Sequence, residues 1–413
     1  MSLSFDQMLQ NYADLAVRVG VGLQPGQRLM LRAPVECASL TRLVVDKAYQ
    51  AGARLVEVLW GDDQTTLSRY RHAPRDSFEE VLTAAPDYMI KGSERGDAVM
   101  SIYAADPDLL KDQDPGIVAQ AQKQLQIYLK PFSKRISGKE INWSIIAAPV
   151  PAWATKVFPD QGEDKAVASL WNAIFRICRA DRPDPVAAWD EHLDTLKRMR
   201  AYLNGKSYAK LHYRAPGTDL TLGMPEGQVW LGGTSHTPGD IPFVANMPTE
   251  EVFSAPHRLQ AEGTVAATKP LSYAGALIDG FRLRFEGGKV VEATAEKNEQ
   301  VLKHLLETDE GATRLGEVAL VPHSSPISAS GLLFYNTLYD ENASCHLALG
   351  RAYRISIDGG EKLSDEDFLA AGGNDSLTHV DFMIGSDAMD IDGITASGDA
   401  EPVMRGGEWA FEA

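Results

Sequence analysis

The residues that could carry chemistry gather between positions 250 and 381, and residues 378–385, THVDFMIG, show the pattern best. His379 and Asp381 stand two positions apart in this stretch, ahead of an apolar run. In a β-strand such positions share a face, while Val380 and Phe382 point to the opposite side. An imidazole and a carboxylate together suit a divalent ion such as zinc, cobalt or manganese. Taken alone, the pair equally fits a buried histidine that is hydrogen-bonded to a neighbouring aspartate.

Three glutamates stand where apolar strands are predicted to begin. Glu250 and Glu251 precede one such strand, so we expect one side chain to face the core and the other the solvent. Glu317 opens another strand in the sequence LGEVALV. Each glutamate taken singly is typical of a solvated strand end, so only their combination with the histidines indicates a site.

A further histidine and a tyrosine lie between these groups. His346 belongs to residues 340–350, which we interpret as a short helix that ends at Gly350. Tyr353 opens a predicted strand over residues 353–357, where a half-buried structural role is common. The acidic and histidine positions from 251 to 381 thus all fall near the starts of predicted elements.

The segments around these residues read NMPTEEVFSAP, LGEVALVPHSSPI, NTLYDENASCHLALGRAY and HVDFMIGSDAMDIDGI. They closely resemble the thermophilic metalloaminopeptidase family of the aminopeptidase T and aminopeptidase S type. NYADLAVRVGVGLQPGQRLML and GTDLTLGM extend the resemblance over essentially the whole chain. The resemblance implies two divalent metal ions in the C-terminal domain, with a tyrosine beside them. The matching ligand positions are Glu251, Glu317, His346, His379 and Asp381, and the matching tyrosine is Tyr353.

The implied activity is that of a metal-dependent aminopeptidase that removes the N-terminal residue from short peptides. Two neighbouring metal ions would activate a bridging hydroxide as the nucleophile and stabilise the developing oxyanion. Catalytic roles then fall to Glu251, Glu317 and Tyr353, whose hydroxyl would hydrogen-bond the oxyanion. Glu250 is the alternative to Glu251 in register and a candidate general base. Zinc, cobalt and magnesium all remain open, and the resemblance also implies a homodimer that encloses the active site.

Two other classes of protein fit part of this pattern. Histidine and carboxylate ligands with open positions can hold a single non-haem iron, as in ring-opening dioxygenases. A binding protein that retains the ligands without catalysis is the second alternative. Five ligands are generous for one ion, so the ligand supply favours a dinuclear site over a single iron. The intact set of motif positions argues against a binding protein without catalysis.

The elements that precede the site alternate between strand and helix. The predicted helices cover residues 4–19, 39–51, 77–89 and 117–130, and the predicted strands cover residues 28–31, 54–60, 98–104 and 142–149. This order predicts an α/β domain over residues 1–185 with a largely parallel sheet. No GxGxxG follows any of these strands, so we expect no nucleotide cofactor.

The pattern of predicted elements changes after the proline-containing break at residues 180–185. A helix is predicted over residues 186–203, and short alternating strands follow, including 210–215, 219–222 and a hairpin of 281–286 with 290–294. We therefore expect residues 186–413 to form a β-rich, mixed α+β catalytic domain that binds the metals.

Composition excludes several partners and compartments. The formal charge of −17, from 40 basic and 57 acidic residues, argues against nucleic acid as a partner. Cys37, Cys178 and Cys345 have no spacing typical of a disulfide framework or a thiolate metal site. The sequence shows no secretory signal and no long apolar run, so we expect a cytoplasmic protein that does not bind membranes.

Overall fold

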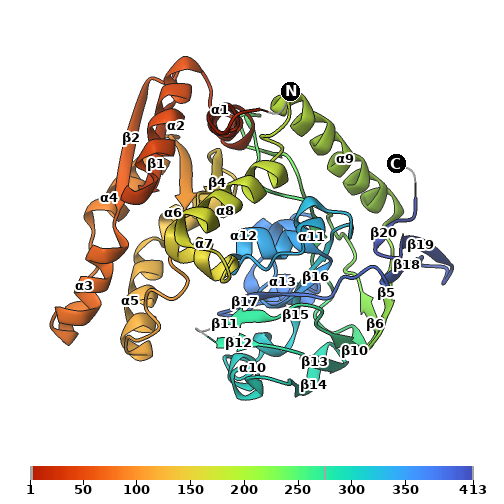
Figure 1. The fold of residues 1–413 in the computed structure, drawn as a ribbon. Helices are drawn as coiled ribbons and strands as arrows, with labels where there is room; N and C mark the ends of the chain where they lie inside the picture. The colour runs from red at the N-terminus through yellow and green to blue at the C-terminus, as the bar shows by residue number, and fades with distance from the viewer. Residues whose placement is uncertain (1–2, 274–275, 412–413) are drawn as a thin grey trace. The chain divides into compact units, whose positions relative to one another are not determined.

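The computed structural model describes residues 3–273 and 276–411, which form two compact units (Figure 1). The first unit contains residues 1–192 and 234–248, and the second contains residues 193–233 and 249–413. Because residues 234–248 return to the first unit, the two units do not divide the chain at a single point. The expected division at residue 185 into separately folding domains stays a prediction.

The first unit is built on a four-stranded parallel sheet with the strand order β2-β1-β3-β4. The parallel sheet covered by helices confirms the predicted fold class for this region. α1 packs against α2 and α8, and α4 packs against α6. The strands are β1 (Arg28–Pro34), β2 (Leu55–Gly61), β3 (Ala98–Tyr103) and β4 (Trp143–Ala147), with the two-residue strands β7 (Ser235–His236) and β8 (Pro242–Phe243) in a separate ladder. The helices are α1 (Phe5–Leu15, continued by a π-helix over Ala16–Gly20), α2 (Ala38–Gln50), α3 (Asp63–His72), α4 (Ala84–Glu94), α5 (Pro115–Tyr128), α6 (Lys130–Ser137), α7 (Pro151–Val157), α8 (Glu163–Ile177) and the first part of α9 (Pro185–Lys206), whose remainder belongs to the second unit.

The helix predicted over residues 77–89 is wrong. Asp62 accepts hydrogen bonds from the backbone N–H groups of Gln64 and Thr65 and so starts α3, which sequence periodicity missed because only Leu67 of this helix is buried. A 3₁₀ helix then spans Arg75–Glu79, and α4 begins only at Ala84. Pro86 is tolerated there because it lies in the first turn of α4.

The second unit contains two main antiparallel sheets and a two-stranded antiparallel sheet of β11 and β12. The larger has the order β14-β13-β10-β6-β5-β18-β19-β20, and the smaller has the order β17-β16-β15-β9. Residues 281–286 and 290–294, predicted as a hairpin, pair as β13 and β14. The strands are β5 (Lys210–Ala215), β6 (Thr218–Gly223), β9 (Val252–Ser254), β10 (Ala261–Ala266), β11 (Leu271–Tyr273), β12 (Ala276–Ile278), β13 (Arg282–Glu286), β14 (Lys289–Thr294), β15 (Leu315–Leu320), β16 (His346–Gly350), β17 (His379–Met383), β18 (Asp390–Ile394), β19 (Ala400–Arg405) and β20 (Glu408–Trp409). Short helices connect them: α10 (Glu299–Leu306), α11 (Pro326–Ser330), α12 (Thr337–Asp340) and α13 (Asp365–Ala370).

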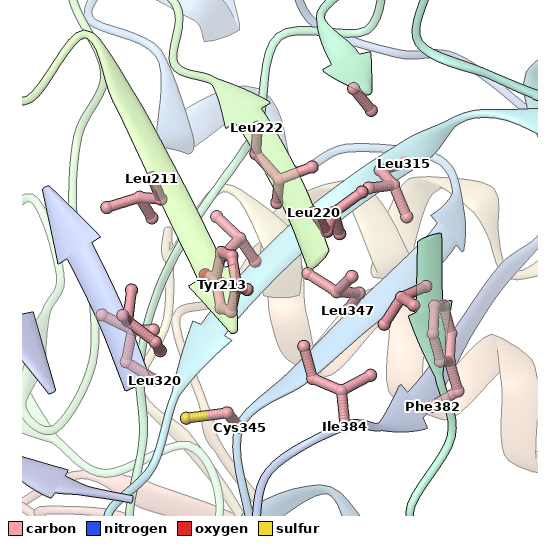
Figure 2. Packing of buried hydrophobic residues seen from close by; sticks show 14 of the residues in the cluster. Leu211, Tyr213, Leu220, Leu222, Leu315, Leu320, Cys345, Leu347, Phe382 and Ile384 are labelled. Atoms are coloured by element: carbon pink, nitrogen blue, oxygen red, sulfur yellow. The ribbon is translucent and has the colours of Figure 1, made fainter. Parts of the chain in front are cut away.

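Side chains from both of these sheets meet in one apolar core (Figure 2). β5 and β6 contribute alternate residues such as Leu211 and Leu220, while the smaller sheet contributes Leu320, Leu347 and Phe382. Strand residues alternate between the two faces of a sheet. The residues between the core positions therefore project from the opposite face of the small sheet, which is where the polar candidates lie.

Two predicted elements near the candidate site are wrong. Residues 340–350 do not form one helix, because a 3₁₀ turn over Glu341–Ala343 follows α12 and the chain then enters β16. Leu347 and Leu349 lie two residues apart, so in a strand both point into the core. This packing outweighs the helical pattern of the local sequence. The strand predicted over residues 353–357 is a 3₁₀ helix, Arg354–Ser356, with Tyr353 just before it.

Candidate metal centre

The small sheet positions most of the candidate ligands on its polar face. Glu317 on β15 pairs in register with Ala348 on β16, which pairs with Asp381 on β17. Residues in register on neighbouring antiparallel strands lie on the same face, so the two carboxylates flank an alanine. His346 and His379 occupy the adjacent positions of this face on β16 and β17. The methyl group of Ala348 leaves the space between the ligands open.

A β-bulge in β15 turns Glu317 toward this face. Leu315 and Glu317 are two residues apart and would share a face in a regular strand, but the register shifts between them. The bulge lets Leu315 pack in the core while Glu317 faces the ligands, as bulges near functional sites commonly re-aim a side chain. Gly316 is required here, because a Cβ atom at this position would lie 2.3 Å from the carbonyl oxygen of Gly350.

The five candidate ligand side chains form two groups that share Glu317. Nε2 of His346 lies 3.2 Å from Oε2 of Glu251 and 3.5 Å from Oε1 of Glu317. Nε2 of His379 lies 3.6 Å from Oε2 of Glu317 and 3.3 Å from Oδ1 of Asp381. Within each group the possible ligand atoms all lie within 4.8 Å of one another. Glu317 can therefore contribute one oxygen to each of two neighbouring cation positions.

Hydrogen bonds outside the cluster orient both imidazoles. Nδ1 of His346 lies 3.2 Å from the carbonyl oxygen of Ser344, and Nδ1 of His379 lies 2.6 Å from that of Arg351. A carbonyl only accepts, so each Nδ1 carries the proton, and a neutral ring then presents its Nε2 lone pair to the cluster. This is the usual outer support of a metal-binding histidine.

Two carboxylate oxygens test whether these residues fit bound cations. Oε2 of Glu251 and Oδ1 of Asp381 are buried and accept no hydrogen bond from the described part of the chain. These two oxygens face the Nε2 atoms of His346 and His379. If both rings are neutral, each Nε2 lone pair points at an anionic oxygen, so a cation or a proton is needed between the two atoms. Oxygen and imidazole donors of this kind suit zinc, cobalt or manganese. The residue set therefore fits divalent metal ions.

The charges of the cluster perturb one another strongly. Burial raises the pKa of Glu317 to about 7, with Asp381 and Glu251 adding to the shift and His346 opposing it. Burial lowers the pKa of His379, but its contact with Asp381 outweighs burial and raises the value to about 9. In the same way, Glu251 and Glu317 overcome burial and raise the pKa of His346 well above its ordinary value. The carboxylates and imidazoles thus act as counterions in the absence of metal.

Tyr353 stands beside the cluster, as the resemblance implies. Its ring lies 5.1 Å from the His379 ring and 6.0 Å from the Phe253 ring, centroid to centroid, and 42% of the residue is exposed. Burial of the hydroxyl, followed by the negative charges of Glu317 and Asp381, raises the pKa of Tyr353 above its ordinary value. The phenol is therefore protonated at neutral pH and can donate a hydrogen bond.

Two further glutamates border the cluster. The expectation that one member of the Glu250 and Glu251 pair faces solvent is wrong, since only 4% and 8% of these residues are exposed. The backbone N–H of Glu250 donates to Oδ1 of Asn342, and Glu250 belongs to neither ligand group. Glu341, which sequence reasoning did not single out, lies in the 3₁₀ turn that contacts β17. Burial, followed by the charges of Glu251 and Asp381, raises the pKa of Glu341 well above its ordinary value. The sequence signal that could have identified Glu341 is its position in ENASCH, five residues before His346.

The fold and the cluster together define a two-unit metalloprotein with a buried carboxylate and histidine centre. The chain belongs to the thermophilic metalloprotease family M29, whose sequence pattern matches residues 5–409. It is 50% identical to Aminopeptidase 2 of Geobacillus stearothermophilus over 99% of each chain. It is 45% identical to Aminopeptidase T of Thermus thermophilus, covering 98% of this chain and 99% of that protein.

A solved structure is similar to this chain along its whole length. Wild-type AmpT from Thermus thermophilus superposes with a TM-score of 0.94 at 43% identity, covering 99% of this chain and 100% of that one. The family resemblance and the fold class inferred from sequence are therefore confirmed. No helix among the described residues is long and apolar enough to cross a membrane.

Proposed function

We propose that this protein is a metal-dependent aminopeptidase that removes the N-terminal residue from short peptides at a centre of two divalent ions. The observation that carries the proposal is the division of the ligands into two groups that share Glu317. A single ion would need only one of these groups. The names of the relatives, all aminopeptidases, support the reaction class.

The ligand roles follow from the two groups. Glu251 and His346 would hold one cation, His379 and Asp381 would hold the other, and Glu317, which belongs to both groups, would contribute to both. Bound divalent ions would lower the pKa of a water molecule and draw negative charge from the scissile carbonyl, and a free substrate amine is a natural additional ligand. The backbone carbonyls of Ser344 and Arg351 hold the two imidazoles in the metal-binding tautomer.

Residues outside the ligand set supply the remaining functions. The protonated hydroxyl of Tyr353 is a donor for the negative charge that develops on the carbonyl oxygen, a role usually worth a few kcal/mol when the donor is pre-positioned. Glu250, which is buried, and Glu341, which is partly buried, border the ligand groups and are the candidates for proton transfer to the leaving amine. Burial of the cluster excludes competing solvent from these contacts.

The finer assignments also remain proposals. We propose zinc, cobalt or magnesium as the metal, a homodimer as the assembly and the cytoplasm as the location. Two alternatives are tested by the same measurements: an iron-dependent ring-opening dioxygenase, which needs only one group of ligands, and a binding protein without catalysis.

The decisive experiment couples metal content to turnover on one preparation. The protein is stripped with a chelator, reloaded separately with zinc, cobalt or magnesium, and assayed with aminoacyl anilides and their N-acetylated forms. We expect activity to disappear on stripping, to return with about two ions per chain, and to require the free amine. About one iron per chain without anilide cleavage would favour the dioxygenase, and tight metal binding with no turnover on any peptide or anilide would favour the binding protein.

A further inference from the structure

A second site candidate lies in the first unit, over one face of its parallel sheet. A cavity of about 650 Å³ is lined by residues from the carboxyl ends of β1, β2 and β3. Leu59, Arg32, Ser101 and Ile145 stand in one register row across β2, β1, β3 and β4, and all four line the cavity. Residues in such a row share a face, so the sheet itself forms the floor.

The strand order places this cavity where open parallel sheets usually bind ligands. The chain runs from β1 outward to β2 and then crosses back to β3 on the other side of β1. The direction of winding therefore reverses between β1 and β3, and the crevice at the carboxyl ends of two such strands is the common binding position. Arg32 and Ser101, paired across this junction, lie in the crevice.

The walls of the cavity are mostly apolar, and several of the apolar side chains are exposed to solvent. Trp60, Leu82, Tyr103 and Leu125 all line it and are 49%, 69%, 42% and 40% exposed, respectively. Exposed apolar side chains are common singly, but four around one concave space are typical of a binding site. Their aromatic and aliphatic groups would accept an apolar ligand.

One cation in the cavity lacks a protein partner. Two arginines line it, and Arg69 donates to the carbonyl oxygens of Ser77 and Glu80. Arg32 makes no hydrogen bond or ion pair with any residue that the structure describes, and its side chain is exposed, so a ligand that enters the cavity can reach the guanidinium. A guanidinium matches a carboxylate in two parallel hydrogen bonds, and such charge-assisted bonds are the strong ones. Because Arg69 is occupied by two backbone carbonyls, Arg32 is left as the arginine that can pair with a ligand, and a single guanidinium favours a monoanion over a phosphate, which usually draws several donors.

We propose that this cavity binds a small organic monocarboxylate with an apolar body. The carboxylate pairs with Arg32, and the apolar part packs against Trp60, Tyr103 and Leu125. The chemistry fits both a free aryl or alkyl acid and the C-terminal carboxylate of an apolar amino acid or short peptide. The site consists of residues of the first unit alone, so the proposal does not depend on the function proposed for the metal centre.

The test measures binding to the full-length chain by titration calorimetry, with and without chelator, because a carboxylate could also reach a metal. The probes are N-acetyl-L-phenylalanine, its uncharged amide, and 4-phenylbutyrate, none of which has a free amine. We expect at least one acid to bind about tenfold or more tighter than the amide, as one charge-assisted pair implies, whether or not metal is present. Binding of both acids indicates a general acid site, and binding of only the acetylated amino acid indicates recognition of a peptide C-terminus.

Two variants make the result specific. Arg32→Gln should remove the preference for acid over amide, while Arg42→Gln, an exposed arginine on α2 outside the cavity, should keep it. Circular dichroism and melting curves check that both variants fold. The proposal is overturned if neither acid binds at 10 mM, a concentration about a decade above weak small-ligand affinities, or if Arg32→Gln binds the acids as tightly as the unmodified chain. It is also overturned if Leu82→Ser breaks a dimer of this chain in sedimentation, because the apolar rim would then be an interface.

Discussion

Replacing Glu317 with glutamine tests the central feature of the site, the carboxylate shared by both ligand groups. Glutamine keeps the shape but removes the charge and one metal-binding oxygen. Loss of even an outer partner of a metal ligand typically costs 10- to 100-fold in metal affinity or activity. Because Glu317 belongs to both candidate ligand groups, we expect the Glu317→Gln variant to lose at least about 100-fold in anilide turnover and to retain fewer than two ions per chain.

In the metal-free protein, the same substitution should raise the free energy of unfolding. A rise in the pKa of Glu317 from 4.5 to about 7 corresponds to roughly 3 kcal/mol of unfavourable ionisation in the folded state. A carboxyl with a raised folded pKa destabilises above that pKa, and this penalty disappears as the pH falls toward 4.5. Glu317→Gln should therefore stabilise the chelated protein by up to about 3 kcal/mol at pH 8 and much less at pH 5. The lost contacts with His346 and His379 reduce the gain.

Denaturant unfolding of the stripped protein at pH 5 and pH 8 measures the change in stability. Anilide turnover of the reloaded protein measures the loss of activity. Glu226→Gln, an exposed glutamate of the second unit outside both ligand groups, is the matched control and should change neither. The reasoning fails if Glu317→Gln keeps turnover within tenfold of the unmodified protein. It also fails if the variant is clearly less stable than the unmodified protein without metal at pH 8.

Three further outcomes are expected. Tyr353→Phe should lower kcat by roughly 10- to 1000-fold with little change in KM, and a raised KM at constant kcat would assign the hydroxyl to substrate binding instead. Glu251→Gln should reduce the metal content measured by mass spectrometry, whereas Glu250→Gln should leave it unchanged; the reverse result would move the ligand by one position. Burial raises the pKa of the Cys37 thiol to about 12 and that of Cys345 to about 11, so at pH 8 both stay protonated. Ellman's reagent should therefore label them quickly only after unfolding, and fast labelling of the native protein at either position would contradict the burial seen here.

The first unit could be predicted well from sequence because its signals are local. Continuous apolar strands separated by helices dictate a parallel sheet whichever order the strands take. The misplaced helix near residues 77–89 shows the limit, since α3 is amphipathic only weakly and is defined by the cap at Asp62. A cap at one residue is harder to recognise in a sequence than a periodic apolar stripe, although either can indicate a helix.

The candidate ligands could be named from their types and their resemblance to a family, but their arrangement could not. Placing His346 on a helix left it without a defined partner, whereas β16 sets it between strands that carry Glu317 and Asp381. Strand pairing is a long-range property, and a one-residue shift in register moves a side chain to the other face. The bulge at Gly316 is such a shift, so the direction of Glu317 depends on a contact with Gly350 far along the chain.

The cost of burying His379 and Asp381, which stand out in THVDFMIG, has a physical explanation in this arrangement. Without cations, the cluster holds buried carboxylates close together, and their mutual repulsion is offset in part by the two imidazoles, whose pKa values the carboxylates raise. The apolar core on the other face of the sheet keeps the strands in place despite this repulsion. Binding free energy that a preformed site gains from divalent ions then adds directly to the stability of the folded state. The same desolvation that destabilises the metal-free cluster therefore strengthens its attraction for cations. Removing one carboxylate should weaken metal binding and raise the stability of the metal-free protein.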